Sequence, residues 1–117
     1  MKQLIAATLV LFALAAGSAG AATQRATATT TVQVKAGEFY FKFSKSSLAK
    51  PGSVSFVVKN VGHLAHDFKI AGKKTPLIQP GKSATLSVTF TKTGSYKYLC
   101  TVPGHAASGM RGTFVVG

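Results

Sequence analysis

The feature that most limits the fold of this chain is a repeated alternation of apolar and polar residues, interrupted by turn signals. In the stretch 84–90, for example, Leu86, Val88 and Phe90 all fall on one face. A period of two residues is typical of strands that bury one face. The turn signals between such stretches are Pro51-Gly52, Pro80-Gly81 and Thr93-Gly94. The pattern predicts an all-β sandwich or barrel of about seven short strands.

No segment has a sustained helical period, and we find no internal repeat. The aromatic residues Phe56, Phe68, Phe90 and Phe114 are expected to fill the core. We expect a first strand from Thr31 and further strands at 39–43, 53–59, 66–70, 84–90, 95–100 and 111–116.

The N-terminus has the features of a secretory signal peptide. A short basic start at Lys2 precedes an apolar run from Leu4 to Ala16, which is too short to span a bilayer comfortably. Small residues with A-x-A-like spacing follow, so we expect cleavage between Ala19 and Ala22 rather than an uncleaved anchor. This predicts a signal peptide at 1–22, a flexible leader at 23–30 and one domain at 31–117. The mature protein is therefore expected to be periplasmic or secreted.

The charge balance is strongly basic. The 117 residues include 14 Lys and Arg but only two acids, Glu38 and Asp67, for a formal net charge of +12. Because the lysines are scattered along the sequence, the alternative is that many of them only keep the outer strand faces soluble. Export and the absence of a recognisable nucleic-acid motif argue against a nucleic-acid partner. We expect an acidic partner protein, or weak contact with an anionic membrane surface, and a monomeric chain.

Three residues set five apart, Cys100, His105 and Met110, indicate a metal site. Cys100 is the only cysteine of the chain, so it cannot form an internal disulfide, and metal ligation would occupy it. A thiolate, an imidazole and a thioether on one short segment suit a soft or borderline metal. Two histidines and a cysteine with a weak axial methionine are the ligands of an electron-transfer copper centre.

This ligand set needs a second histidine from elsewhere, and the candidates are His63 and His66. We favour His66, because it immediately precedes an expected strand, whereas His63 lies in a looser turn beside Gly62. Pro103, Gly104 and Gly109 provide the backbone freedom that two tight loops between Cys100 and Met110 require.

The run GSYKYLCTVPGHAASGM, with NVGHLAHDF upstream, resembles the cupredoxins, the small blue copper proteins of the plastocyanin, auracyanin and azurin type. The resemblance extends from about Thr31 to Gly117. It implies a Greek-key β-sandwich of about seven to eight strands and one type 1 copper held by His66, Cys100, His105 and Met110. Many relatives have Asn after the first histidine, where this chain has Asp67. A carboxylate there is expected to lower the copper potential.

The resemblance implies a shuttle for single electrons and not an enzyme, with His105 partly exposed to an acidic redox partner. The main alternative is a periplasmic copper carrier or storage protein that uses the same ligands. A Cys-His nucleophile is disfavoured because Met110 lies on the same short segment. A zinc site leaves Met110 unexplained, and a metal-free binding module leaves the whole constellation unexplained.

Overall fold

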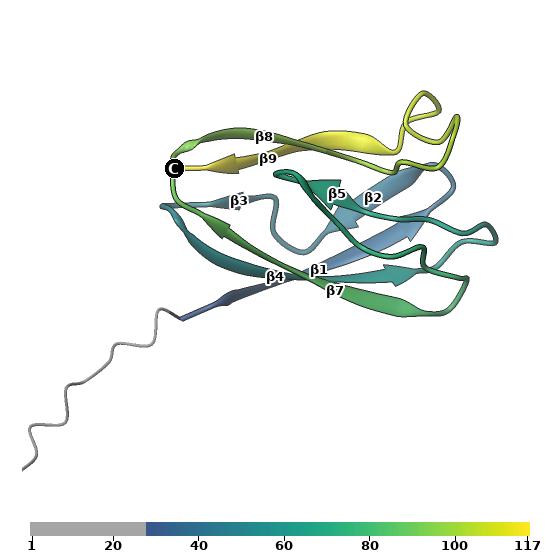
Figure 1. Ribbon diagram of the computed structural model, residues 1–117, viewed down its shortest axis with the longest axis horizontal. Helices are drawn as coiled ribbons and strands as arrows, with labels where there is room; N and C mark the ends of the chain where they lie inside the picture. Colours follow the sequence, from purple (N-terminus) through teal and green to yellow (C-terminus); the bar gives the residue numbers. More distant parts are fainter. Residues whose placement is uncertain (1–27) are drawn as a thin grey trace, which may run out of the picture.

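The structure is a computed structural model that describes residues 28–117, so the expected signal peptide and residues 23–27 of the leader lie outside it. The described chain forms a β-sandwich (Figure 1). No helix among these residues is long and apolar enough to cross a bilayer. The strands are β1 (Thr30–Gly37), β2 (Tyr40–Phe43), β3 (Ser47–Leu48), β4 (Gly52–Asn60), β5 (Lys69–Ile70), β6 (Lys73–Lys74), β7 (Ser83–Phe90), β8 (Gly94–Leu99) and β9 (Arg111–Val116).

The strands form two sheets that face each other. One sheet has the order β2-β1-β4-β7, and the other has the order β3-β9-β8-β5-β6. Neighbours are antiparallel except β1 with β4 and β3 with β9, which are parallel. The chain therefore crosses repeatedly between the sheets, and the predicted all-β sandwich is confirmed.

The core lies between the sheets, because every long strand turns alternate apolar side chains inward. Phe56 is at its centre, with its ring centroid 5.3 Å from that of Phe68 and 5.4 Å from that of Phe114. Phe90 is also buried, so all four phenylalanines predicted for the core are found there. Such edge-to-face and tilted aromatic pairs add to the stability that burial of apolar area provides.

Two of the expected strands are shorter than the alternation indicated. The stretch 39–43 begins a residue later, because the chain turns between Gly37 and Tyr40 and leaves Phe39 in the turn with 37% of its surface exposed. The stretch 66–70 forms a ladder only at Lys69–Ile70, since His66 makes an isolated bridge with Ile78. Both departures depend on pairing with distant segments, which a local pattern does not contain.

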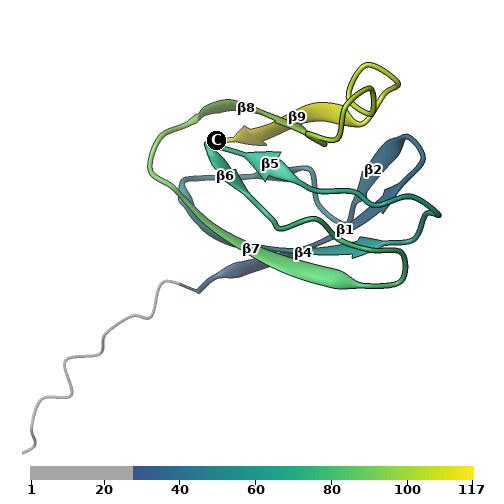
Figure 2. The same ribbon diagram turned by 45° about the vertical axis from the view of Figure 1, so that its right-hand side comes forward.

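The sandwich has two distinct ends. At the hairpin end, β1 turns into β2, β4 ends, and β8 passes into the loop 100–110 (Figure 2). At the opposite end, which we call the C-terminal end, β7 connects to β8 and the chain finishes at Gly117 (Figure 1). All of the residues selected from the sequence as metal ligands lie at the hairpin end or beneath it.

Candidate metal centre

His66 is fixed at the hairpin end by backbone pairing. Its N–H donates to the carbonyl of Ile78 at 3.1 Å, and its carbonyl accepts from the Ile78 N–H at 2.7 Å. The imidazole is fully buried. His63, the other candidate, is exposed in the preceding loop.

Cys100 directly follows β8 in an alternation with Tyr96 and Tyr98, and its side chain is buried. Backbone hydrogen bonds close the loop that follows, and three of them involve the proposed ligands. The N–H of Cys100 donates to the carbonyl of Met110 at 3.0 Å, and the N–H of Met110 donates to the carbonyl of His105 at 3.1 Å. The N–H of His105 in turn donates to the carbonyl of Val102 at 3.1 Å. The loop is thus a fastened structure that sets the spacing of three side chains.

Gly104 and Gly109 are needed for the two bends of this loop. Their φ angles are +83° and +123°, a region that glycine enters without steric cost. At Gly109 a side chain would in addition press on the carbonyl oxygen of Phe39, 3.0 Å from an added Cβ. These two positions confirm the backbone freedom expected of the segment.

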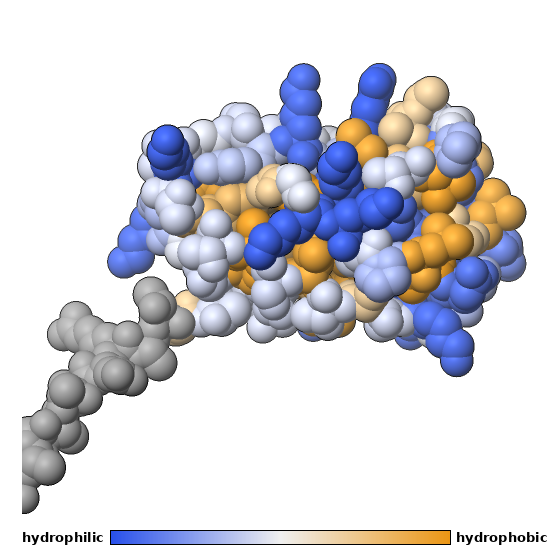
Figure 3. All heavy atoms as spheres, viewed as in Figure 1, coloured by the Kyte–Doolittle hydropathy of each residue, from blue (hydrophilic) through white to orange (hydrophobic). Residues whose placement is uncertain are grey.

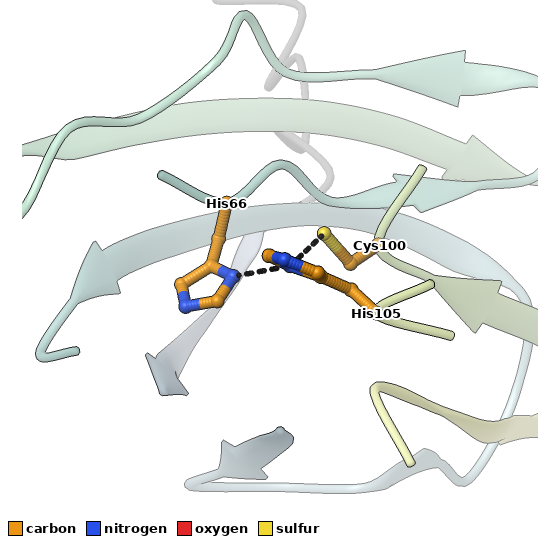
Figure 4. A group of neighbouring side chains, drawn as sticks. All are labelled: His66, Cys100 and His105. Carbon is orange, nitrogen blue, oxygen red and sulfur yellow. Dashed lines mark hydrogen bonds between the residues drawn. The ribbon is translucent and has the colours of Figure 1, made fainter. Parts of the chain in front are cut away.

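The structure brings His66, Cys100 and His105 together, with one ligand atom from each lying within 4.8 Å of the others (Figure 4). The Nδ1 atoms of the two histidines are 3.1 Å apart, and the Cys100 sulfur is 3.7 Å from the His105 Nδ1. Met110 is fully buried and is tied to both loop ligands through its backbone. Three of the four residues selected from the sequence therefore bring their ligand atoms to one place, and the backbone of the fourth, Met110, is bonded to two of them.

The donor set fits a soft or borderline metal ion. Burial lowers the pKa of His66, against the attraction of the nearby Glu38 carboxylate, and so favours the neutral imidazole that a metal requires. Burial raises the pKa of the Cys100 thiol, so a metal must displace its proton to bind. Two facing imidazole nitrogens and a sulfur, all screened from water, match the ligands of a type 1 copper centre.

Asp67 links the His66 segment to the Cys100 segment. Its Oδ1 accepts a hydrogen bond from the backbone N–H of Thr101 at 2.6 Å, and its Oδ2 accepts a short one from the Thr101 hydroxyl. The carboxylate is almost completely buried. Asp67, which stands where many relatives have Asn, thus bonds the residue after Cys100 to the segment of His66.

Asn60 is a further organising residue that sequence reasoning missed. It is fully buried at the end of β4, and its side-chain amide donates to the carbonyls of Leu64 at 2.7 Å and Ile78 at 2.8 Å. Its Oδ1 accepts from the N–H of Gly62 at 2.9 Å. The signal available in the sequence was that Asn60 is the lone Asn of the chain and stands just before the loop that leads to His66.

Glu38 is the second residue that was missed. It lies in the turn between β1 and β2, and its Oε1 accepts hydrogen bonds from the backbone N–H groups of His63 at 2.5 Å and Leu64 at 2.6 Å. Desolvation acts to raise its pKa, but these hydrogen bonds outweigh it and hold the pKa below its usual value. The signal available in the sequence was its rarity, because Glu38 and Asp67 are the only two acids of the chain.

The fold and the donor set together define a copper-binding β-sandwich protein of the cupredoxin type. The sequence profile of the family described as "Copper binding proteins, plastocyanin/azurin family" matches residues 19–117, and the chain belongs to this family. Its cofactor is copper, and the single His-Cys-His cluster of residues 28–117 matches one copper ion per chain.

Among curated proteins, the chain is similar to the copper-resistant cuproprotein CopI of Pseudomonas aeruginosa. The two are 25% identical, over 98% of this chain and 97% of CopI. Among solved structures, dithionite-reduced auracyanin from Roseiflexus castenholzii matches with a TM-score of 0.67 and 24% identity, over 77% of this chain and 98% of that one. Auracyanin A, a "blue" copper protein from Chloroflexus aurantiacus, matches with a TM-score of 0.67 and 20% identity, over 77% and 100%. These structural likenesses establish the shared fold.

Proposed function

We propose that this protein is exported and shuttles single electrons between redox partners, with copper held by His66, Cys100 and His105 and with Met110 as a weak axial ligand. In this proposal the protein is an electron carrier and not an enzyme. The basic start, the apolar run and the small-residue segment at the N-terminus support export.

The observation that carries the proposal is the convergence of the three donors on a hydrogen-bonded framework. Asp67, Asn60 and the backbone bonds of the loop 100–110 hold the ligand-bearing segments from several sides. Side chains held in this way resist the rearrangement that would otherwise accompany a change of charge at the centre.

When bound, copper supplies the one-electron couple, with sulfur ligands favouring the reduced ion and imidazoles also suiting the oxidised one. The protein's part is to keep both kinds of donor in one arrangement. The buried positions of His66, Cys100 and Met110 exclude water from the centre. His105 is the most exposed of the four, at 8%, so its ring edge is the natural route for an electron.

A partner would meet an apolar surface around His105. The ring of Phe39 contacts the His105 ring edge-on, with centroids 5.0 Å apart. Phe39, Leu64 and Leu77 are exposed large apolar residues, and the last two are close in sequence to His66 and its bridge partner Ile78. Figure 3 shows hydrophobic surface at the hairpin end, on the right of the view. Such a patch allows a partner to approach closely.

The lysines that are scattered in sequence form rows in the fold. Lys42, Lys35 and Lys59 lie side by side across β2, β1 and β4, near the hairpin end, and all three are exposed. Because like charges directly opposite each other destabilise a sheet, this row works against the stability of the sheet that carries it. A second row on the other sheet places Lys74 opposite Lys69, with Arg111 beyond Leu99. These rows support steering of an acidic partner toward the hairpin end.

The partner proposal is tested with charged redox reagents and a matched control. We expect the variant Lys35→Glu/Lys59→Glu to slow electron exchange with anionic hexacyanoferrate, with the difference shrinking at high salt. Lys50→Glu/Lys92→Glu makes the same change in net charge at the C-terminal end and should have a clearly smaller effect. Equal effects of the two variants would show that only net charge matters and would remove the docking proposal.

The copper assignment itself is tested by spectroscopy. The mature domain with one equivalent of Cu(II) should show a strong visible thiolate-to-copper band that disappears on reduction. Cys100→Ser should abolish the band while the protein stays folded. A colourless wild-type complex, or a band that survives in Cys100→Ser, would contradict the proposed ligands.

The likeness to a copper-resistance protein favours a second candidate, a copper carrier or storage protein with the same ligands. Repeated oxidation and reduction in the presence of a strong Cu(I) chelator separates the two. A shuttle keeps its metal through many cycles, whereas a carrier gives it up to the chelator within a few.

A further inference from the structure

Within residues 28–117, the Nε2 of His66 is the one buried side-chain nitrogen or oxygen that lacks a hydrogen-bond partner. The opposite ring nitrogen, Nδ1, faces the ligand cluster. Buried polar groups are nearly always paired, because an unpaired one costs about 1–3 kcal/mol. We therefore expect the Nε2 of His66 to have a hydrogen-bond partner when the site is occupied.

The group that faces this nitrogen is the carboxylate of Glu38, whose Oε1 is 3.7 Å from Nε2. A shift of about 0.7 Å would bring the pair to ordinary hydrogen-bond length. The carboxylate is only 24% exposed, and its Oε1 is already held by the N–H groups of His63 and Leu64. It is thus anchored in place beside the ring.

Gly62 supplies the room that this carboxylate occupies. A Cβ at position 62 would collide with the Glu38 carboxyl group. Gly62 is also held from its other side, since its N–H donates to Asn60. The loop before His66 is therefore shaped around the Glu38 side chain.

We propose that Glu38 is a positioning residue for the copper site, accepting a hydrogen bond from Nε2–H of His66 and so leaving Nδ1 free to bind the metal. A carboxylate behind a ligating histidine fixes its tautomer and ring orientation and makes it a stronger ligand. One oxygen atom then organises both the ligand and the loop that leads into it. With Asp67 at Thr101, both acids of this basic chain serve the copper site.

The proposal separates two effects of Glu38, its hydrogen bond and its charge. Glu38→Gln keeps an oxygen for the His63 and Leu64 amides and for Nε2–H, but it loses the negative charge. It should keep the His66 tautomer and raise the reduction potential, because a negative charge stabilises Cu(II) over Cu(I). A tenfold selective loss of Cu(II) affinity corresponds to a rise of about 59 mV.

Glu38→Ala removes both effects. We expect its Cu(II) affinity to fall about 10- to 100-fold, and we expect ¹⁵N NMR of the metal-free protein to show a mixture of His66 tautomers. Gly62→Ala should disturb the tautomer in the same way with the charge still present, because it displaces the carboxylate. If Glu38→Ala does not fold, the His66 tautomer in Gly62→Ala tests the proposal instead.

The control is Ser83→Lys, which makes the same change in net charge at an exposed position of β7, also at the hairpin end. It should leave the tautomer unchanged and shift the potential less than Glu38→Gln. A wild-type tautomer and wild-type copper affinities in both Glu38→Ala and Gly62→Ala would overturn the proposal. A Ser83→Lys shift equal to that of Glu38→Gln would also contradict a specific role for the Glu38 charge.

Discussion

The carboxylate of Asp67 accepts two hydrogen bonds from Thr101, one from the backbone N–H at 2.6 Å and one from the hydroxyl. The two residues are 34 positions apart in sequence, and each follows a proposed copper ligand. The contact therefore joins the loop after β8, which carries Cys100, to the segment before β5, which carries His66. It also places a negative charge beside a buried sulfur whose pKa is raised by burial.

We expect Asp67→Asn to raise the reduction potential while the protein stays folded. An asparagine can still accept the Thr101 N–H bond, but it carries no charge to stabilise oxidised copper. Loss of one nearby charge is worth on the order of 1–2 kcal/mol at an effective dielectric constant of about 20, which corresponds to roughly 40–80 mV. Protein-film voltammetry measures it directly.

Thr101→Val is the matched control, because it removes the hydroxyl bond and leaves the carboxylate. Its potential should change less than that of Asp67→Asn. If the two variants shift the potential equally, the hydrogen bond and not the charge sets the effect.

Met110→Gln should keep the copper and lower its potential. The thioether favours Cu(I), whereas an amide oxygen is a harder ligand that favours Cu(II). Because Met110 is fully buried, the polar side chain should also cost the metal-free protein about 1–3 kcal/mol of stability. Voltammetry and urea unfolding of the metal-free form test the two parts. A potential equal to that of the wild type would argue against axial coordination by Met110.

Much of the fold was predictable because the long strands each bury one face. The alternation at 84–90 and at 111–116 survives in β7 and β9 nearly residue for residue. The two-residue strands β3 and β6 were not predicted, because they are too short to show an alternation and exist only through pairing with β9 and β5. The expected strand at 66–70 is present only as β5, where Lys69–Ile70 pairs with β8. The turn at Glu38–Phe39 was missed for a similar reason, since Phe39 continues the local alternation although the hairpin closes there.

The convergence of the proposed ligands was predictable because three of them lie on one short segment and the fourth precedes a strand. Their role as copper ligands stays a prediction. The groups around them required the fold. Glu38 meets His63 and Leu64 across 25 and 26 residues, and the row of Lys42, Lys35 and Lys59 depends on strand register. Spacing along a chain contains neither kind of information.

Asn60→Ala should be among the more damaging polar substitutions in this protein. It removes the hydrogen bonds that the side chain makes to the carbonyls of Leu64 and Ile78 and to the N–H of Gly62. The loss of three hydrogen bonds should cost about 2–4 kcal/mol in the free energy of unfolding. It should also weaken copper binding, because Ile78 pairs with His66. Gln33→Ala, at an exposed position of β1, should cost little by comparison. A loss below about 0.5 kcal/mol for Asn60→Ala would refute the bracing role.

Copper affinity should rise with pH in a way that traces to Cys100. Burial raises the pKa of this thiol, so it holds its proton at pH 7 in the metal-free protein, and binding must release that proton. Burial keeps His66 neutral in the same range by lowering its pKa. The logarithm of the apparent affinity should therefore rise by about one unit per pH unit between about pH 7 and 8. Chelator competition at several pH values gives the slope, and Cys100→Ser should flatten it. A flat wild-type profile would mean that the thiol is already ionised before the metal binds.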